Sequence, residues 1–433
     1  MIKKLMGYNN LYGAIKNGFF YKTYKQLNGK IANLLYGYPS KDFFIIGVTG
    51  TNGKTTTVNL IHKILNENLG KTIMISTANM KIGEKEFENN KKMTSLDIYD
   101  LMALLETAKN EGCKIAVLET SSHGLEQSRF EGIDFDLAVL TNITHDHLDY
   151  HGTMEKYADA KEKLFKYVLH NHKQNKYAVF PGDDKIGRKW FEQMSFDNKI
   201  NFCIDNSGIL KAENIKENFN GTEFEIIYMG KKYAVKTPLL GKFNVYNILA
   251  ALSVGLEIGI GLEKIITSIE GFKGISGRME YFENKGIHYF VNFAHSPDAL
   301  ENILRYLKDI KGNGRLITIF GAPGNRDKFK RPIMGEIVEQ YADIAIATDD
   351  DPDSENRLSI LKQLTEKINK KTLGKDFFIL PERSFAIKFA LKIAKPGDIL
   401  VFTGKGHETV QLTNYGKRIR NDKTEILNNL KSD

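Results

Sequence analysis

A glycine- and threonine-rich segment near the start of the chain has the composition of a phosphate-binding loop. It stands between an apolar segment and a helical pattern, and it reads Gly47-Val48-Thr49-Gly50-Thr51-Asn52-Gly53-Lys54-Thr55-Thr56. Glycines let backbone N–H groups turn toward phosphate oxygens, and the start of a helix adds partial positive charge. Lys54 would reach the β- and γ-phosphates of a nucleotide, and the Thr55 hydroxyl would reach Mg²⁺.

Position 48 departs from the general phosphate-loop pattern, because this chain has valine where that pattern has glycine. An ordinary glycine turn before a core helix is the alternative interpretation. The sequence Gly53-Lys54-Thr55 between an expected strand and an expected helix favours phosphate binding over that alternative.

Polar clusters follow two further apolar segments. Residues 119–123 read Glu-Thr-Ser-Ser-His, and residues 142–149 read Asn-Ile-Thr-His-Asp-His-Leu-Asp. Ligands of a doubly wound sheet bind beyond the carboxyl ends of its strands, so Glu119 and His147 could meet the Mg²⁺ of the nucleotide. Because Mg²⁺ prefers oxygen ligands, the histidine-rich cluster is alternatively a transition-metal site. Polar capping of strand ends is the third interpretation.

The elements that must position these clusters alternate along the chain. Apolar segments at 43–50, 71–77, 114–120 and 134–143 are expected strands, and helical patterns occur at 53–68, 95–112 and 157–171. This alternation predicts a mostly parallel, doubly wound α/β sheet. Residues 177–236 are richer in strand signals, and a helix is expected again over residues 241–259.

A glycine-rich stretch at residues 271–277 marks an expected domain boundary, and the alternation restarts after it. Strands are expected at 287–296, 315–322, 342–350 and 398–406, and Ser296-Pro297-Asp298 is a favourable helix start. The expected fold is therefore a central P-loop ATPase-type sheet followed by a smaller Rossmann-like α/β domain. The expected divisions are a short N-terminal segment or linker at 1–41, a central ATP-binding domain at 42–275, and a C-terminal domain at 276–433.

Composition narrows the class of protein. Hydrophobic residues make up 42% and charged residues 26% of the 433 residues, which is typical of a globular chain. The two cysteines, Cys113 and Cys203, form no CxxC pair, so we expect a reducing compartment and no structural zinc. We find neither a signal peptide nor a membrane span in the sequence and expect a cytoplasmic protein. The net charge of +8 comes from scattered lysines, which favours an anionic small substrate over nucleic acid.

Several long motifs, in order, resemble those of the Mur ligases, and most closely the MurE group of UDP-N-acetylmuramyl-tripeptide synthetases. They are TGTNGKTTT, ETSSHGLEQSRFEGIDFDLAVLTNITHDHLDYHGTMEKYADAKEKLF, GKFNVYNILAA, GRME, FAHSPDAL, GNRDKFKRPIMGEI and TGKGHE. The resemblance covers residues 37–425 and accounts for Val48, because the loop of this family has no glycine there. It implies ATP and Mg²⁺ as cofactors, peptidoglycan synthesis as the process, and an acyl phosphate that an amino acid converts into an amide.

The resemblance also implies roles for individual residues. Lys54, Glu119, His147 and Lys161 are the implied catalytic residues, and Lys161 is the lysine that becomes carbamylated. The implied metal ligands are Thr55, Glu119, His147 and carbamylated Lys161. The implied nucleotide contacts are Gly50, Thr51, Asn52, Gly53, Lys54, Thr55, Thr56, Asn247, Arg278, Asn292 and His295. The implied acceptor contacts are Thr94, Ser95, Ser121 and Arg129. The implied amino-acid contacts are Arg326, Asp350, Asp351, Asp353, Gly404 and Glu408.

The chain departs from the family in three places. Only a short segment precedes the central domain, whereas family members carry an N-terminal domain for the uridine nucleotide. The uridine nucleotide could be held differently, a protein partner could supply that function, or the acceptor could lack uridine diphosphate. Residues 350–353 read Asp-Asp-Pro-Asp where diaminopimelate-using members have Asp-Asn-Pro-Arg, so we expect a basic amino acid such as lysine or ornithine. Asn292 replaces the family's aspartate near the ribose, which predicts altered nucleotide contacts.

Three other functions compete with a ligase of the peptidoglycan precursor. The first is a related amide ligase with an acceptor that lacks uridine diphosphate, either another cell-wall peptide or a polyglutamate. The second is a silent family member that binds nucleotide as a scaffold, which the presence of Lys54, Glu119, His147 and Lys161 argues against. The third is a simple P-loop kinase, which leaves the second α/β domain and the TGKGHE motif without a role.

Overall fold

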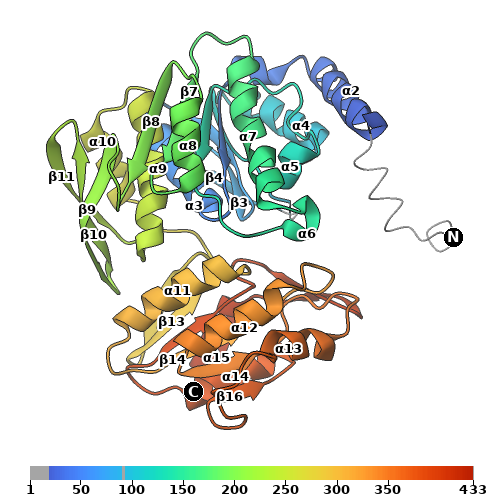
Figure 1. Cartoon of the computed structure of the whole chain (residues 1–433), viewed down its shortest axis with the longest axis vertical. Helices are drawn as coiled ribbons and strands as arrows, with labels where there is room; N and C mark the ends of the chain where they lie inside the picture. The colour runs from blue at the N-terminus through green and yellow to red at the C-terminus, as the bar shows by residue number, and fades with distance from the viewer. Residues whose placement is uncertain (1–18, 90–92, 433) are drawn as a thin grey trace.

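The apolar segments of the chain form two separate sheets in the computed structural model, which describes residues 19–89 and 93–432. Figure 1 shows the two bodies, with the segments up to about residue 270 above and the remainder below. The large sheet has 11 strands in the order β11-β10-β9-β8-β7-β6-β1-β5-β2-β3-β4. Its strands are β1 (Phe44–Thr49), β2 (Thr72–Ile75), β3 (Asn79–Ile82), β4 (Lys85–Glu88), β5 (Ile115–Glu119), β6 (Leu137–Leu140), β7 (Tyr177–Pro181), β8 (Asn198–Cys203), β9 (Leu210–Asn218), β10 (Gly221–Tyr228) and β11 (Lys231–Thr237).

The centre of the large sheet is parallel. Strands β2, β5, β1, β6, β7, β8 and β9 pair in parallel, whereas β3–β4 and β10–β11 extend the two edges in antiparallel fashion. The central strands β1, β5 and β6 are almost fully buried, as parallel strands with both faces covered must be. Their carboxyl ends therefore meet at one edge, where the polar clusters after residues 49, 119 and 140 come together.

Two layers of helices cover the large sheet, and the apolar core divides between its two faces. The helices are α2 (Phe19–Leu35), η2 (Pro39–Asp42), α3 (Lys54–Asn68), α4 (Ile98–Asn110), α5 (Ser122–Glu126), α6 (Leu148–His151), α7 (Met154–His170), α8 (Lys185–Gln193), α9 (Lys242–Glu257) and α10 (Leu262–Glu270). Helices α3, α9 and α10 pack on one face, and α4, α7 and α8 pack on the other. The Thr153 hydroxyl caps α7 by accepting the backbone N–H of Lys156, which fixes the start of this helix.

The second sheet has six strands in the order β12-β13-β17-β14-β15-β16 and is parallel except for β12–β13. Its strands are β12 (Glu280–Asn284), β13 (Ile287–Val291), β14 (Leu316–Phe320), β15 (Ile344–Ala347), β16 (Phe377–Ile379) and β17 (Ile399–Phe402). The ribbon β18 (Val410–Thr413) and β19 (Gly416–Ile419) follows it. The helices are α11 (Pro297–Ile310), α12 (Lys330–Tyr341), α13 (Arg357–Thr365), α14 (Arg383–Ile393) and α15 (Asp422–Ser432).

The structure confirms the expected α/β class with a large and a smaller sheet. Helix α11 begins where expected, since the Ser296 hydroxyl accepts the backbone N–H of Ala299 and proline follows it. The expected division at residue 275 stays a prediction, and it lies in the connection between α10 and β12. The expected N-terminal lead-in contains α2, while residues 1–18 lie outside the described residues. None of the helices in the described part of the chain has the length and apolar character needed to cross a membrane.

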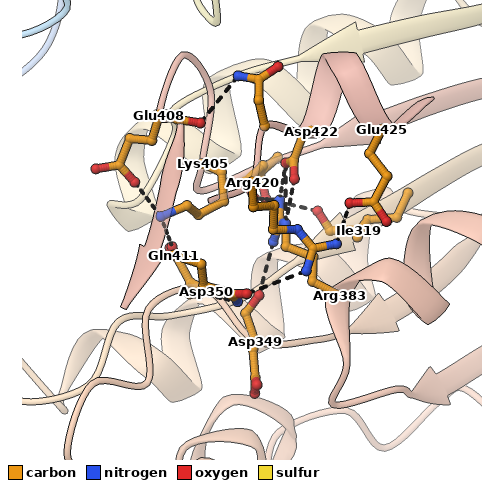
Figure 2. Close-up of polar contacts among 12 residues, drawn as sticks. Ile319, Asp349, Asp350, Arg383, Lys405, Glu408, Gln411, Arg420, Asp422 and Glu425 are labelled. Atoms are coloured by element: carbon orange, nitrogen blue, oxygen red, sulfur yellow. Dashed lines mark hydrogen bonds and ion pairs between the residues drawn. The ribbon is translucent and has the colours of Figure 1, made fainter. Parts of the chain in front are cut away.

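A buried ion pair ties the C-terminal helix to the second sheet. Arg383 and Asp422 are both fully buried, and the guanidinium donates to both carboxylate oxygens, at 2.5 and 2.9 Å for the two shortest contacts. Figure 2 shows this pair beside the loops that follow β15 and β17. Arg383 also donates to the carbonyl oxygens of Asp349 at 3.2 Å and Thr403 at 2.8 Å. The pair therefore fixes two strand-end loops as well as α15.

Removing Asp422 should destabilise the second domain strongly. The variant Asp422→Ala leaves the Arg383 guanidinium buried without its counter-charge, and loss of one partner of a buried pair costs about 3–5 kcal/mol. Urea denaturation measures this loss in the free energy of unfolding. The control Asp309→Ala changes an exposed aspartate of α11 and should change stability by less than about 0.5 kcal/mol. Equal stability of Asp422→Ala and the unmodified protein would contradict the bracing role.

Candidate active site between the two domains

The phosphate-loop segment joins β1 to α3 and needs glycine at two positions. Gly50 has φ 149° and a Cβ there would meet Thr141 Oγ1 at 1.8 Å, whereas Gly53 has φ 83° and a Cβ there would meet Asn247 Oδ1 at 2.0 Å. Neither position tolerates a side chain without displacing its neighbour. Gly53 ends the loop and Lys54 begins α3. The loop thus presents backbone amides at a helix N-terminus, as phosphate binding requires.

Lys54 folds back over the loop. Its ammonium donates to the carbonyl oxygens of Gly50 at 2.9 Å and Thr51 at 2.7 Å. Burial lowers the pKa of Lys54, and the nearby Glu119 carboxylate opposes that shift. The side chain is half-buried and lines the cavity. An ammonium that is held only by neutral carbonyl oxygens in this position is suited to bind a phosphate oxygen.

Glu119 is the buried carboxylate at the end of β5. Its Oε2 accepts the Thr55 hydroxyl at 3.1 Å and the backbone N–H of Thr77 at 2.7 Å, and its Oε1 accepts the Thr77 hydroxyl at 2.9 Å. Among the described residues, no lysine, arginine or histidine nitrogen forms an ion pair with Glu119. A buried carboxylate that faces a cavity with hydroxyls but without a paired cation fits Mg²⁺, which prefers such oxygen ligands. These residues therefore fit a Mg²⁺ near Thr55 and Glu119, and their role as metal ligands stays a prediction.

Lys161 projects from α7 to the back of the phosphate loop. Its side chain is 1% exposed, its ammonium donates to the carbonyl oxygen of Gly50 at 2.7 Å, and it lies 4.2 Å from the Tyr157 ring centroid. Burial holds the pKa of Lys161 well below its usual value, and the neighbouring Lys54 lowers it further. A neutral amine is the form that reacts with CO₂, so the environment fits the carbamylation that the family resemblance implies.

Histidines near the loop do not gather into a separate metal cluster. His147 stands at the start of α6 with φ 54°, and burial lowers the pKa of its imidazole. Its Nε2 lies 3.5 Å from Asp146 Oδ2, and its ring centroid is 4.8 Å from that of His123. Within the described residues, the one group of three acidic, histidine or cysteine side chains with closely spaced ligand atoms lies elsewhere, in the second domain. The transition-metal interpretation of the cluster at residues 145–147 therefore gains no support.

A polar edge beside Glu119 carries the expected acceptor contacts. The hydroxyls of Ser95 and Ser121 are 2.9 Å apart, and the backbone N–H of Ser121 donates to Ser95 Oγ at 2.9 Å. Arg129 donates to the carbonyl oxygen of Ser95 at 2.6 Å, and the hydroxyl oxygens of Thr77 and Thr94 are 2.9 Å apart. All four expected residues line the cavity, so hydroxyls and a guanidinium face any ligand there.

The opposite wall belongs to the second domain and carries a group of acidic side chains. Asp350 follows β15, and Glu408 lies in the loop after β17. One carboxylate oxygen from each of Asp350, Asp351 and Glu408 lies within 4.8 Å of the others. Burial raises the pKa of Asp350 to about 6. We call these three residues the acidic cluster, and the exposed guanidinium-bearing Arg326 lines the same cavity.

The cavity has a volume of about 590 Å³ and is lined from both domains. Two contacts close to it cross between them. Asn52 Nδ2 donates to Asp298 Oδ2 at 2.5 Å, and Arg278 Nη2 donates to Thr55 Oγ1 at 3.4 Å. Most of the expected site residues line it together: Gly50, Thr51, Asn52, Gly53, Lys54, Thr55, Thr56, Thr94, Ser95, Glu119, Ser121, Arg129, His147, Lys161, Arg278, His295, Arg326, Asp350, Asp351, Gly404 and Glu408.

Three expected residues lie outside the cavity lining. Asn247 is buried behind the phosphate loop, where its Nδ2 donates to Asn244 Oδ1 at 2.9 Å. Asn292 is buried, and its Oδ1 accepts the backbone N–H of Ala294 at 3.0 Å. Asp353 is exposed, and its carboxylate accepts Asn325 Nδ2 at 3.1 Å. The expected roles of these residues therefore stay predictions that rest on their motifs.

Some residues that line the cavity were not identified from the sequence. Thr77 binds Glu119 through its backbone and its hydroxyl, and its place directly after a strand was a usable signal. Lys330 begins α12, is 7% exposed and lines the cavity, but one lysine among many gives no signal in the sequence. Asp146 also lines the cavity, although the sequence pattern assigned no role to it beside its neighbouring histidines.

Known proteins resemble this chain over both of its domains. The family description "Mur ligase middle domain" matches residues 48–255, and "Mur ligase, glutamate ligase domain" matches residues 277–406. A UDP-N-acetylmuramoyl-L-alanyl-D-glutamate--2,6-diaminopimelate ligase of Bacillus cereus is 39% identical over 393 residues, which cover 90% of this chain and 78% of that protein. A solved structure of such a ligase is 31% identical with a TM-score of 0.65, and the match covers 94% of this chain and 83% of that one.

A more distant structure shares the fold alone. The folylpolyglutamate synthase of Mycobacterium tuberculosis, solved with ADP and AMPPCP, is 16% identical with a TM-score of 0.71. That match covers 88% of this chain and 92% of the other.

Replacing Lys54 should weaken nucleotide binding. Hydrogen bonds to charged groups contribute about 1.5–3 kcal/mol, so Lys54→Met should raise the Kd for ATP by about 10- to 100-fold in isothermal titration calorimetry. The matched control Lys63→Met lies on the same helix, where its ammonium pairs with Glu67 at 2.5 Å on the surface. That control should bind ATP as the unmodified protein does. Undiminished affinity in Lys54→Met would place the phosphates elsewhere.

Proposed function

This chain belongs to the Mur ligase family, and we propose that it joins an amino acid to a UDP-N-acetylmuramoyl-dipeptide-type peptidoglycan precursor. It is an ATP-dependent amide ligase that uses ATP with Mg²⁺, as the ligases of this family do. The proposed amino acid is a basic one, such as lysine or ornithine. The proposed acceptor is a small-molecule carboxylate, and no nucleic acid takes part.

One observation carries the proposal. A single cavity has the phosphate loop, with Lys54 and Thr55, on its first-domain side and the acidic cluster on its second-domain side. The first side suits the anionic phosphates of ATP, whereas the second suits the ammonium of an amino acid. An acceptor carboxylate between them would meet both reactants. A P-loop kinase has no need of the second, acidic wall.

The first-domain residues bind and orient ATP and the acceptor in this proposal. Lys54 and the loop amides hold the β- and γ-phosphates, and Arg278 reaches the nucleotide from the second domain. Glu119, His147, Thr55 and carbamylated Lys161 would hold Mg²⁺, which when bound neutralises charge on the phosphates and the acceptor carboxylate. The peptide end of the acceptor binds at the polar edge, which consists of Thr94, Ser95, Ser121 and Arg129.

The reaction then needs two transfers. An oxygen of the acceptor carboxylate attacks the γ-phosphorus of ATP, the bond to the β-phosphate oxygen breaks, and ADP leaves. The neutral amine of the amino acid attacks the carbonyl carbon of the resulting acyl phosphate. The carbon–oxygen bond to the phosphoryl group breaks, inorganic phosphate leaves with the electron pair, and an amide remains after the amine loses a proton. Arg326 would hold the α-carboxylate of the amino acid, and Glu408 would hold its amine.

Charge in the second domain supports a basic amino acid. The named relatives take 2,6-diaminopimelate, which carries a second carboxylate as well as a second ammonium. Here Asp351 and Asp350 stand with Glu408 in the acidic cluster, and this concentration of negative charge would repel a second carboxylate. Asp353 lies outside the cavity lining, and Asp350 and Glu408 belong to motifs that the family shares. The proposed amino-acid preference therefore rests on Asp351, which replaces the asparagine of diaminopimelate-using members.

A panel of amino acids tests the proposed substrates. Phosphate release should require ATP, the uridine-linked dipeptide acceptor and an amino acid together, with lysine or ornithine giving higher kcat/KM than diaminopimelate. The physical reason is the acidic cluster, which attracts an ammonium and repels a carboxylate. Diaminopimelate as the better substrate would contradict the charge argument. Turnover only with an acceptor that lacks uridine diphosphate would favour the alternative ligase, and no amine-dependent turnover would contradict both.

Replacing Lys161 tests the carbamate role. Lys161→Ala should lose ligation almost completely, and short carboxylates added at millimolar concentration should restore part of it by occupying the emptied space. A protein labelled with carbon-13 CO₂ should show a carbamate NMR signal that the variant lacks. Lys166→Ala is the matched control, because Lys166 lies on the exposed side of α7 and pairs with Glu162 at 2.5 Å. Full activity of Lys161→Ala without added carboxylate would refute the role.

A further inference from the structure

Lys405 lies behind the acidic cluster and not in the cavity wall. Its side chain is 1% exposed, and the neighbouring Gly404 and Glu408 line the cavity whereas Lys405 does not. Its ammonium donates to Asp351 Oδ1 at 2.7 Å, to Glu408 Oε2 at 2.5 Å and to the carbonyl oxygen of Val410 at 3.0 Å. These acceptors use all three donors of the ammonium.

The cavity therefore meets carboxylates and not the ammonium behind them. Lys405 has no donor left for the carboxylate of a substrate. Asp350, 3.8 Å from the same ammonium, lines the cavity together with Asp351 and Glu408. Because three carboxylates outnumber one ammonium, the acidic cluster keeps a surplus of negative charge that a substrate ammonium can balance.

The loops that carry the cluster are fixed from behind, as Figure 2 shows. Gln411 is 2% exposed, and its Nε2 donates to the carbonyl oxygen of Asp350 at 2.6 Å. The backbone N–H of Leu412 donates to Asp351 Oδ1 at 2.9 Å. The buried Arg383–Asp422 pair holds the backbone of the same loops. Lys405 is the member of this network whose charged group contacts the carboxylates of two cluster residues.

We propose that Lys405 is a positioning residue that sets the charge preference of the amino-acid site, by fixing Asp351 and Glu408 where they accept the ammonium groups of a basic amino acid. This inference rests on the proposed function, because it concerns the amino-acid side of the ligation. It adds a residue that touches no reactant and acts through the two carboxylates that it holds.

The physical basis is repulsion among like charges. Without the Lys405 ammonium, three carboxylates would stand close together in a largely buried place, and each would raise the pKa of the others. They would bind protons or move apart, and either response removes the fixed acceptors for a substrate ammonium. Although burial alone would lower the pKa of Lys405, the three carboxylates hold it above its usual value, so the ammonium stays charged.

The variant Lys405→Met in the full-length protein tests the inference. Truncating one partner of a buried charge pair typically costs enough to change affinity about thirtyfold or more, so the KM for lysine should rise by about that factor. The KM values for ATP and for the uridine-linked dipeptide should change by less than about twofold. Lys405→Arg keeps a cation and should recover most of the affinity. The control Lys367→Met, whose ammonium pairs with Glu336 at 2.7 Å on the surface, should change none of the three constants.

Charge compensation gives a readout that loss of structure would not produce. The double variant Lys405→Met/Asp351→Asn removes one carboxylate together with the ammonium, so its KM for lysine should fall below that of Lys405→Met alone. If Lys405→Met does not fold, Asp351→Asn is compared with the unmodified protein instead. The preference of this variant for lysine over diaminopimelate should fall, while its KM for ATP stays constant.

Two results would overturn the inference. One is a lysine KM in Lys405→Met that stays at the level of the unmodified protein or rises together with the ATP KM. The other is an unchanged amino-acid preference in Asp351→Asn. Failure of the unmodified protein to ligate any amino acid would instead contradict the proposed function, and that result is known before any variant is compared.

Discussion

Charge that lies in the interdomain cavity has to be balanced there, because moving an ion out of water into a protein interior is costly. The groups on the two sides of the cavity suit different reactants. Around the phosphate loop, Lys54 and Arg278 accompany the carboxylates of Glu119 and Asp146, and backbone amides at the start of α3 face the same space. In the second domain, the acidic cluster surrounds the single ammonium of Lys405. Anionic phosphates and a cationic amine are the reactants that suit these two sides, so the charge pattern orders the substrates along the cavity.

The fold explains why neither domain holds the site alone. Parallel strands bring Glu119 and the phosphate loop to one edge of the large sheet, and the second sheet brings the loops after β15 and β17 to its own edge. Contacts such as Asn52 to Asp298 join the two edges across the cavity. In the proposed reaction, the amine and the phosphoryl donor are therefore held by different domains. A change in the angle between the domains would separate the reactants without unfolding either sheet.

The sequence was sufficient for the parts of the structure that depend on local pattern. Strand and helix periodicity predicted both sheets, and the strand-end rule predicted that Glu119 and His147 lie near the loop, where both line the cavity. The hairpin β3–β4 was missed because its outer strand is exposed and carries charged residues at most positions. Asp353 entered the amino-acid set through its motif, but a positive φ and a contact with Asn325 keep it at the surface. The role of Lys405 depends on tertiary contacts that no local pattern reveals.

The central claim is that a carboxylate becomes an acyl phosphate in this cavity and is then captured by a basic amino acid. An acceptor labelled with oxygen-18 in its reactive carboxylate tests this claim most directly, with ATP, Mg²⁺ and lysine present. The account predicts that one labelled oxygen appears in the inorganic phosphate of each turnover, together with an amide product. Unlabelled phosphate, or labelled phosphate without an amide, would contradict it.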